Sequence, residues 1–238
     1  GTATSVTDNS GLANGTTYTY RVFAKDATTP CYAVGSTTEV TGLPVASGGK
    51  EQWAYMANSG SALKAPIASD DGIYFGTNGT RATSLSASTG IQRWTPAATT
   101  SALQGWLIPV PLSAGGSRVF AGDQSGNLYS VNTSTGATAA GWAPSTLTGA
   151  KFQAGASVQL RAYSTGMPGS GYDLVYMATK NGASTTNNKV YALRSDTGAV
   201  VWTFNENETL SVGEISGMPL VDYARNRLYV TSLSTSGT

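Results

Sequence analysis

The sequence predicts an all-β protein in which one kind of four-stranded unit recurs along most of the chain, after a short and different β segment. Three observations predict it. Polar and apolar residues alternate with a period of two in short runs, glycine-rich turns separate these runs, and a Gly-x-x-x-Trp pattern recurs. The 238 residues include 29 Gly, 27 Ser and 33 Thr, and only 11% are charged, against about 25% in an average soluble domain. This hydroxyl-rich composition favours an extracellular or cell-surface protein.

Residues 1–45 are the first predicted segment, and residues 17–24 are its clearest strand because their polarity alternates. Leu12 precedes Tyr18 by six residues across an Asn-Gly turn. This arrangement resembles the tyrosine corner of fibronectin type III domains, in which the Tyr hydroxyl binds nearby backbone. The resemblance implies the C-terminal half of such a β-sandwich, with a last strand within residues 35–42 and its first strands outside this sequence.

Residues 46–238 are the second predicted segment, and they repeat. The Gly-to-Trp pattern occurs at residues 49–53, 90–94 and 198–202, with a looser copy at 136–142. The central aromatic residues of the units are Tyr74, Phe120, Tyr176 and Tyr229, which lie 46, 56 and 53 residues apart. Such periods with short strands predict β-propeller blades of four strands each. We count about three and a half blades, so we expect the remaining blades on sequence outside this chain or on another chain.

The strand, Thr-Gly turn, strand and Trp of each unit resemble the repeat of PQQ-binding-like propellers, whose four-stranded blades are like those of WD40 propellers. The turn Gly adopts a positive φ, and the resemblance implies that the Trp ring packs against a neighbouring blade. In quinoprotein dehydrogenases of this fold, the quinone needs a stacking Trp, basic residues, a catalytic Asp and Ca²⁺. The chain has no Cys-Cys pair and no cluster with calcium-loop spacing. We therefore expect no catalytic, cofactor-binding or metal-binding residues, and no cofactor.

Composition excludes several other functions. The chain has no His, so a Ser-His-Asp or Cys-His nucleophile system is impossible within it. Its one cysteine, Cys31, is predicted to be a buried thiol or to pair with a Cys outside this sequence. The net charge is +1 without a basic run, which argues against nucleic acid as a partner. No stretch of about 20 apolar residues predicts a membrane span. The chain has no initial Met, so we expect sequence to precede it.

Acidic residues are the remaining candidates for chemistry. Glu206 and Glu208, with Glu214 nearby, form the main acidic cluster, and paired carboxylates can serve as acid and base on a glycan. Their position after a Trp-containing strand instead predicts a solvated loop. Three other acidic segments are predicted to be turns: residues 70–72, 123–127 and 195–198.

Three functions remain in competition. The first is a non-catalytic binding or scaffold module of a secreted or surface protein of bacteria, with a protein or glycan ligand on a propeller face. The second is a fragment of a quinoprotein-like or haem-containing redox protein, which the resemblance to quinoprotein repeats suggests. The third is an accessory part of a secreted glycan-active enzyme, since fibronectin type III modules often accompany such enzymes. The composition and the predicted domain pairing favour the first.

Overall fold

The computed structural model describes residues 12–13, 16–20, 40–42, 53–55, 64–95, 97–143, 146–164, 171–182, 187–207 and 210–233. The chain divides into two compact units, residues 1–52 and residues 53–238. The described residues form β-strands and one short 3₁₀ helix, η1 (Arg161–Tyr163). None of the helical structure in the described part of the chain is long and apolar enough to cross a membrane.

The first unit contains one described strand pair. β1 (Tyr18–Tyr20) pairs antiparallel with β2 (Val40–Gly42). The backbone N–H of Ala13 donates a hydrogen bond to the Tyr18 hydroxyl at 2.9 Å, which is the type of contact expected of a tyrosine corner. The fibronectin type III assignment itself stays a prediction, and Cys31 lies outside the described residues.

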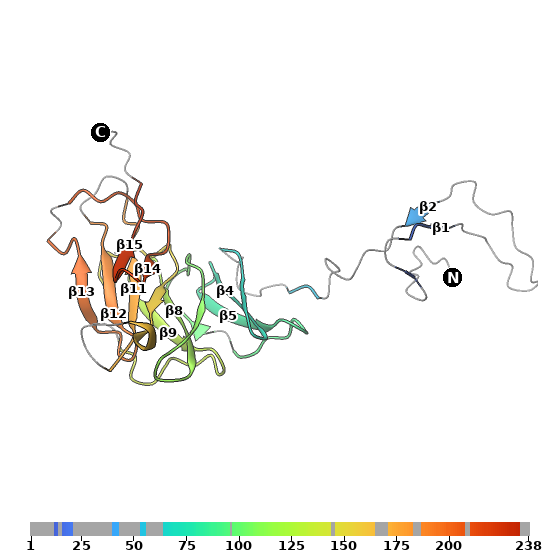
Figure 1. The fold of residues 1–238 in the computed structure, drawn as a ribbon, viewed down its shortest axis with the longest axis horizontal. Coiled ribbons are helices and arrows are strands. Elements are labelled where there is room, and N and C mark those ends of the chain that lie inside the picture. The colour runs from blue at the N-terminus through green and yellow to red at the C-terminus, as the bar shows by residue number, and fades with distance from the viewer. Residues whose placement is uncertain are drawn as a thin grey trace, which may run out of the picture. The chain divides into compact units, whose positions relative to one another are not determined.

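The second unit is a series of antiparallel sheets, which Figure 1 shows with the strands of neighbouring sheets side by side. The first sheet contains β3 (Ile67–Ser69), β4 (Gly72–Thr77), β5 (Arg81–Ser86) and β6 (Ala97–Ala98), and the second contains β7 (Pro109–Pro111), β8 (Ser117–Gly122) and β9 (Leu128–Asn132). The third contains β10 (Ser157–Gln159), β11 (Leu174–Ala178), β12 (Val190–Arg194) and β13 (Val200–Phe204), and the fourth contains β14 (Leu220–Asp222) and β15 (Arg227–Tyr229). Every strand pairs with its neighbour in sequence, so each sheet is a meander.

The fourth strand differs among the sheets. In the third sheet, Trp202 lies in the middle of β13 rather than at the strand's end. In the first sheet the segment after Gly90 forms the isolated bridge Leu85–Gln92 and then the two-residue strand β6, and in the second sheet the segment after Gly136 forms the isolated bridge Val131–Thr138. The difference follows from composition, because β13 reads Val-Val-Trp-Thr-Phe whereas the equivalent segment of the second sheet is rich in Ala and Gly.

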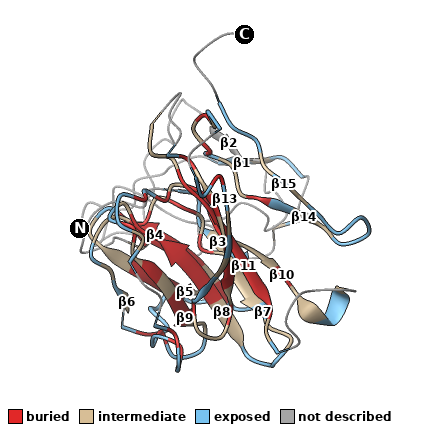
Figure 2. Ribbon diagram, turned by 90° about the vertical axis from the view of Figure 1, so that its left-hand side faces the viewer, coloured by how far each residue is buried: buried red, intermediate tan, exposed pale blue. Residues whose placement is uncertain are grey.

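Both faces of the middle strands are buried, which indicates that the sheets stack face to face. On β8, Val119 and Ala121 belong to the apolar cluster shared with the first sheet, whereas Phe120 belongs to the cluster shared with the third. β11 repeats this pattern one sheet later, since Val175 contributes to the cluster with the second sheet and Tyr176 to the cluster with the fourth. Burial concentrates on middle strands such as β8 and β11, whereas β14 and the turn that follows it are more exposed (Figure 2).

Two buried serines, one in the first sheet and one in the second, supply a first prediction. Ser130 on β9 and Ser84 on β5 are both 0% exposed, and neither hydroxyl has a hydrogen-bond partner among the described residues. The third sheet carries Ala192 opposite its central aromatic, where Ser84 and Ser130 lie in the first two sheets. Because a buried unsatisfied hydroxyl is unfavourable, we expect Ser130→Ala to leave the free energy of unfolding unchanged or to raise it by about 1 kcal/mol. Urea denaturation measures this, and a loss above about 1 kcal/mol would show that the hydroxyl has a partner.

Candidate functional site

Tryptophan side chains join consecutive sheets through the Thr-Gly turns. The Trp94 indole Nε1 donates to the Thr133 carbonyl at 3.1 Å, and a Cβ placed on Gly136 would lie 2.4 Å from the Trp94 ring. Trp53 repeats both contacts one sheet earlier: its Nε1 donates to the Ala87 carbonyl at 2.9 Å, and its ring lies against Gly90. Both glycines adopt a positive φ, +70° and +72°. For Trp53 and Trp94, these contacts confirm that the ring packs against a neighbouring sheet.

The Thr-Gly turns of the first three sheets are stabilised by polar side chains of three kinds. In the first sheet, Asp71 accepts hydrogen bonds from the Ser88 backbone N–H and hydroxyl, and the backbone hydrogen bond is the main reason why the pKa of the Asp71 carboxyl lies below its ordinary value. In the second, the Asn132 side chain accepts from Ser134. In the third, Arg194 binds Asp196 through two hydrogen bonds of 2.9 and 2.7 Å. Different side chains thus stabilise the equivalent turn in each of the three sheets.

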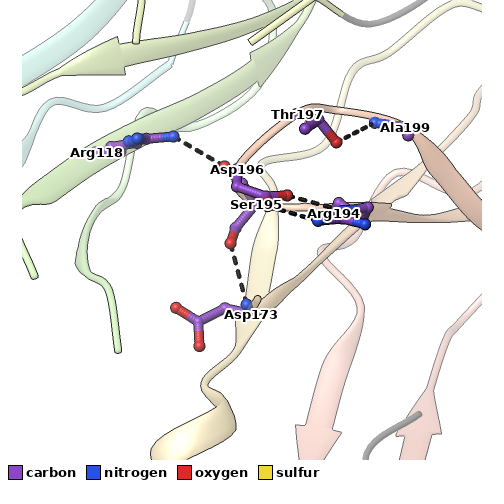
Figure 3. Close-up of polar contacts among 7 residues, drawn as sticks. All are labelled: Arg118, Asp173, Arg194, Ser195, Asp196, Thr197 and Ala199. Atoms are coloured by element: carbon purple, nitrogen blue, oxygen red, sulfur yellow. Dashed lines mark hydrogen bonds and ion pairs between the residues drawn. The ribbon is translucent and has the colours of Figure 1, made fainter. Parts of the chain in front are cut away.

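The joint between the second and third sheets is formed by different contacts (Figure 3). The carbonyl of Ser195 lies three residues before Gly198, as Thr133 does before Gly136. It accepts a hydrogen bond of 2.9 Å from the Arg118 guanidinium instead of from an indole. Trp142 turns inward, with its Nε1 3.4 Å from the Leu128 carbonyl in its own sheet. The two additional residues between Gly136 and Trp142, compared with the other copies, account for the different path.

The Arg118 contact supplies a second prediction. We expect Arg118→Met to lower the free energy of unfolding by about 1–2 kcal/mol, because it leaves the Ser195 carbonyl without its charged donor. Arg225→Met is the matched control, since Arg225 is exposed and its ion pair among the described residues is with Asp222 across a turn, and such pairs contribute about 0–0.5 kcal/mol. Guanidinium denaturation of both variants measures the difference. Equal losses would show that Arg118 does not join the sheets.

Asp173 links the same two sheets at the end that carries η1. Its side chain is buried, and its two carboxylate oxygens accept hydrogen bonds of 2.8 Å from the backbone N–H groups of Ser113 and Arg161. Its own backbone N–H donates to the Ser195 hydroxyl at 3.1 Å (Figure 3). Both carboxylate oxygens are occupied by backbone donors, so Asp173 is a structural cap on this joint.

Asp123 organises the β8–β9 hairpin, as the sequence predicts for residues 123–127. The side chain is 0% exposed. It accepts hydrogen bonds from the Tyr129 hydroxyl at 2.7 Å, the Thr100 hydroxyl at 2.9 Å and the Ser125 backbone N–H at 2.8 Å. Burial raises the pKa of the Asp123 carboxyl, but these hydrogen bonds outweigh it and hold the pKa below its ordinary value. Asp123 therefore stays ionised as the centre of a hydrogen-bonded turn.

The acidic cluster of the sequence does not form a shared site among the described residues. Glu206 is exposed in the loop after β13, as predicted, and its backbone carbonyl accepts from Lys189. Glu214 pairs with Lys180 at 3.2 Å and forms a β-bridge with Leu233. Glu208 lies outside the described residues. A glycan-cleaving pair on these residues therefore has no geometric support in the described part of the chain.

In the described part of the chain, neither Trp53 nor Trp94 forms a site for a quinone with its calcium ion. Trp53 and Trp94 are covered by the Gly turns, so neither ring is available to stack on a quinone. Across the described ranges, no three Asp, Glu, Cys or His residues converge as metal ligands. Trp53 and Trp94 are therefore parts of the sheet joints.

A groove beside Trp202 is the candidate binding site. Its larger compartment has a volume of about 410 Å³ and lies between β13 and β15. Most of its lining is apolar: Val190, Trp202, Phe204, Val212, Ile215, Leu228 and Val230, with Ser211 and Ser232. Trp202 and Phe204 occupy the same face of β13, and both are partly exposed. The groove thus exposes aromatic surface at the outer edge of the third sheet.

A second compartment of about 210 Å³ continues the groove beyond Trp202 and Leu228. Tyr176 and Gln159 line it, and the Tyr176 hydroxyl donates to Gln159 Oε1. Burial raises the pKa of Tyr176 to about 12, so this hydroxyl is a neutral donor at physiological pH. Asn226 and Arg227 give this end of the groove a polar rim.

Sequence reasoning does not identify this groove. It treats Trp202 as a structural residue of the repeat, and Phe204 and Val230 carry no motif. The available signal is the alternation of Val200, Trp202 and Phe204, which places three large apolar side chains on one strand face. Whether a neighbouring strand covers such a face depends on residues far along the chain, so alternation alone cannot reveal the exposure.

Comparison with known families gives a match over part of the chain. A family model described as outer membrane protein assembly factor BamB matches residues 31–141. The span includes the first two sheets of the second unit and both Gly turns that receive Trp rings. No curated protein matches the chain. The match and the stacked antiparallel sheets support a propeller-type protein with PQQ-like repeats.

Three solved structures are also similar at low identity. BamB from Moraxella catarrhalis is 18% identical, with 92% of this chain and 67% of that chain covered and a TM-score of 0.47. The computationally designed Ika4 protein is 11% identical, with 78% and 99% covered and a TM-score of 0.48. The computationally designed Ika8 protein is 13% identical, with 73% and 46% covered and a TM-score of 0.45.

Proposed function

We propose that this chain is a propeller section that acts as a non-catalytic scaffold and binds another polypeptide, within a larger extracellular or cell-surface protein of bacteria. The groove beside Trp202 is the observation that carries the proposal. Exposed aromatic side chains next to a strand edge are the features with which proteins bind extended polypeptides. The polar clusters around Asp123 and Asp173, by contrast, are occupied by hydrogen bonds within the fold.

Two further observations support this role. The matching family model is described as an outer membrane protein assembly factor, and a role in assembling other proteins requires a surface that binds polypeptides. The low charged fraction and the abundance of Ser and Thr are typical of proteins outside the cell. A fibronectin type III segment before the propeller would act as a spacer in such a protein.

The absorbance spectrum and the turnover of the native full-length protein test the non-catalytic part of the proposal. We expect only the bands of Trp and Tyr, and no turnover of dye-linked alcohols or polysaccharides. Bands of haem or of a bound quinone would support the redox alternative instead. Polysaccharide cleavage that is lost in Glu206→Gln and Glu208→Gln would support the glycan-active alternative.

Surface proteolysis tests the location. Protease added to intact source cells is expected to cleave the protein, while a cytoplasmic marker stays intact. Protection of the protein until the cells are lysed would contradict the extracellular assignment.

A further inference from the structure

Arginine and lysine are distributed unevenly between the two ends of the sheets. In a meander, the turn after the first strand and the turn after the third strand lie at the same end. The arginines of the second, third and fourth sheets at this end are Arg118, Arg161, Arg194, Arg225 and Arg227. The described lysines lie at the opposite end: Lys64, Lys151, Lys180 and Lys189. Because a guanidinium binds a carboxylate or a phosphate through two parallel hydrogen bonds, the arginine-rich end is suited to recognise such groups.

A cavity of about 50 Å³ lies at the arginine-rich end, between the second and third sheets. The β7–β8 turn, Arg118, Arg161 and the turn after β12 line it. A water molecule occupies about 30 Å³ in the liquid, so the cavity has room for a group of roughly three heavy atoms. A carboxylate group has this size, whereas a sugar ring or an aromatic side chain is too large.

The charges around the cavity favour an anion. The described charged residues at this joint are three arginines and two aspartates: Arg118, Arg161, Arg194, Asp173 and Asp196. Both aspartates already have donors, because Asp173 accepts two backbone hydrogen bonds and Asp196 accepts two from Arg194. The joint therefore carries a net positive charge, and its carboxylates are not available to bind a cation.

Arg118 is the residue that can bind the anion directly. It is half-buried, and its Nη1 donates to the Ser195 carbonyl at 2.9 Å (Figure 3). A guanidinium has five N–H donors in one plane, and within the described ranges the Ser195 carbonyl is the one hydrogen-bond acceptor of Arg118. Because this contact already restrains the side chain, less conformational entropy is lost when a ligand binds to its remaining donors.

We propose that this cavity binds a carboxylate group, presented as an Asp or Glu side chain of a partner polypeptide, and the polypeptide source rests on the proposed function. Arg118 donates hydrogen bonds to the carboxylate, and Arg161 contributes a second positive charge. The carboxylate enters past the β7–β8 turn, where Ala114 and Gly115 are exposed and a Cβ added to Gly115 would meet nothing within 4 Å. The cavity shares no lining residue with the groove beside Trp202, so it is a separate contact.

A pair of small compounds tests the carboxylate site. The probe is N-acetylglutamic acid α-amide, in which the side chain carries the one carboxyl group, and N-acetylglutamine α-amide is its neutral control of the same shape. Each is titrated into the full chain at constant ionic strength, and the Arg118 Nε–Hε resonance is followed by NMR. We expect a saturable shift with the Glu compound at a dissociation constant of about 1–10 mM. The Gln compound is expected to bind at least tenfold more weakly.

Three variants show which groups bind the carboxylate, with the backbone amide resonance of Gly115 as the readout. Arg118→Lys keeps the charge but loses the planar pair of donors, so we expect binding at least tenfold weaker. Arg161→Met is expected to bind at least fivefold more weakly, and it keeps the backbone N–H that Asp173 accepts. Arg225→Met is the matched control, because Arg225 is an exposed arginine at the same end but outside the cavity. It is expected to bind as the unmodified chain does, and circular dichroism checks the fold of each variant.

Several outcomes overturn the assignment. No saturable shift up to about 50 mM, or equal binding of the Glu and Gln compounds, excludes a carboxylate site in this cavity. Tighter binding of inorganic phosphate than of the Glu compound would assign the cavity to a phosphate group instead. Binding of the Glu compound without any polypeptide binding by the full-length protein would keep the carboxylate site and contradict the proposed function. Polypeptide binding that Trp202→Ala abolishes and Arg118→Lys leaves intact would keep the proposed function and exclude this cavity from it.

Discussion

Replacing Trp94 with alanine is expected to lower the free energy of unfolding by about 3–5 kcal/mol, because it opens a cavity between the first and second sheets and removes an indole hydrogen bond. Trp94 is buried, and it belongs to the cluster that contains Tyr74, Val119 and Val131. Gly136→Ala is expected to lower the free energy by about 3 kcal/mol, because the new Cβ meets the Trp94 ring at 2.4 Å and the residue has a φ of +72°.

A double-mutant cycle separates these two causes. In the Trp94→Ala background, Gly136→Ala is expected to cost only about 1 kcal/mol, since the ring is gone and only the positive φ remains. Gly115→Ala is the matched control, because Gly115 has a φ of +92° and a Cβ added to it would meet nothing within 4 Å. It is also expected to cost about 1 kcal/mol. Additive losses in the cycle would show that the ring and the glycine are not in contact.

Asp123→Ala is the second large effect, with an expected loss of about 3–5 kcal/mol. The substitution removes a buried carboxylate that accepts hydrogen bonds from the half-buried Tyr129 and from the exposed residues Thr100 and Ser125, and hydrogen bonds to a charged group contribute about 1.5–3 kcal/mol each. Asp123→Asn is expected to lose less, because the amide oxygen still accepts hydrogen bonds. Urea denaturation at neutral pH measures both variants, and a loss below about 1 kcal/mol for Asp123→Ala would contradict the role of this side chain.

The same carboxylate gives the fold a pH dependence with a definite sign. The pKa of Asp123 is lower in the folded chain than its ordinary value of 3.8. Its contribution to stability is therefore fully present above that ordinary value and is lost as the pH falls through the lower folded pKa. The pKa values of Asp71 and Asp196 are lowered as well, so Asp123→Asn is expected to weaken the acid dependence without abolishing it. An unchanged pH profile for this variant would exclude Asp123 as a source.

The repeat could be predicted from the sequence because each of its parts has a local cause. A Gly at positive φ, an alternating strand and a following Trp are recognisable within ten residues, and the predicted central aromatic residues Tyr74, Phe120 and Tyr176 do lie on the middle strands β4, β8 and β11. The turn at residues 70–72 is also predicted, although its positive φ falls on Asp70 while Gly72 begins β4.

The partners of the repeat residues could not be predicted, because they depend on contacts between distant segments. Arg118 and Ser195 are 77 residues apart, and no local pattern indicates that an arginine takes over the role of an indole there. Trp142 matches the repeat and nevertheless turns into its own sheet, since two additional residues change its path. The exposure of Trp202 likewise depends on which strand lies beside β15 rather than on the sequence of β13.

Proton NMR of the glycines tests the claim that Trp rings join consecutive sheets through Thr-Gly turns. The Hα protons of Gly90 and Gly136 lie against the rings of Trp53 and Trp94, so they are expected to shift upfield of the Gly115 Hα protons and to show nuclear Overhauser contacts to indole protons. Trp94→Ala is expected to abolish the shift at Gly136 alone. Unshifted Gly136 protons without indole contacts would contradict the claim.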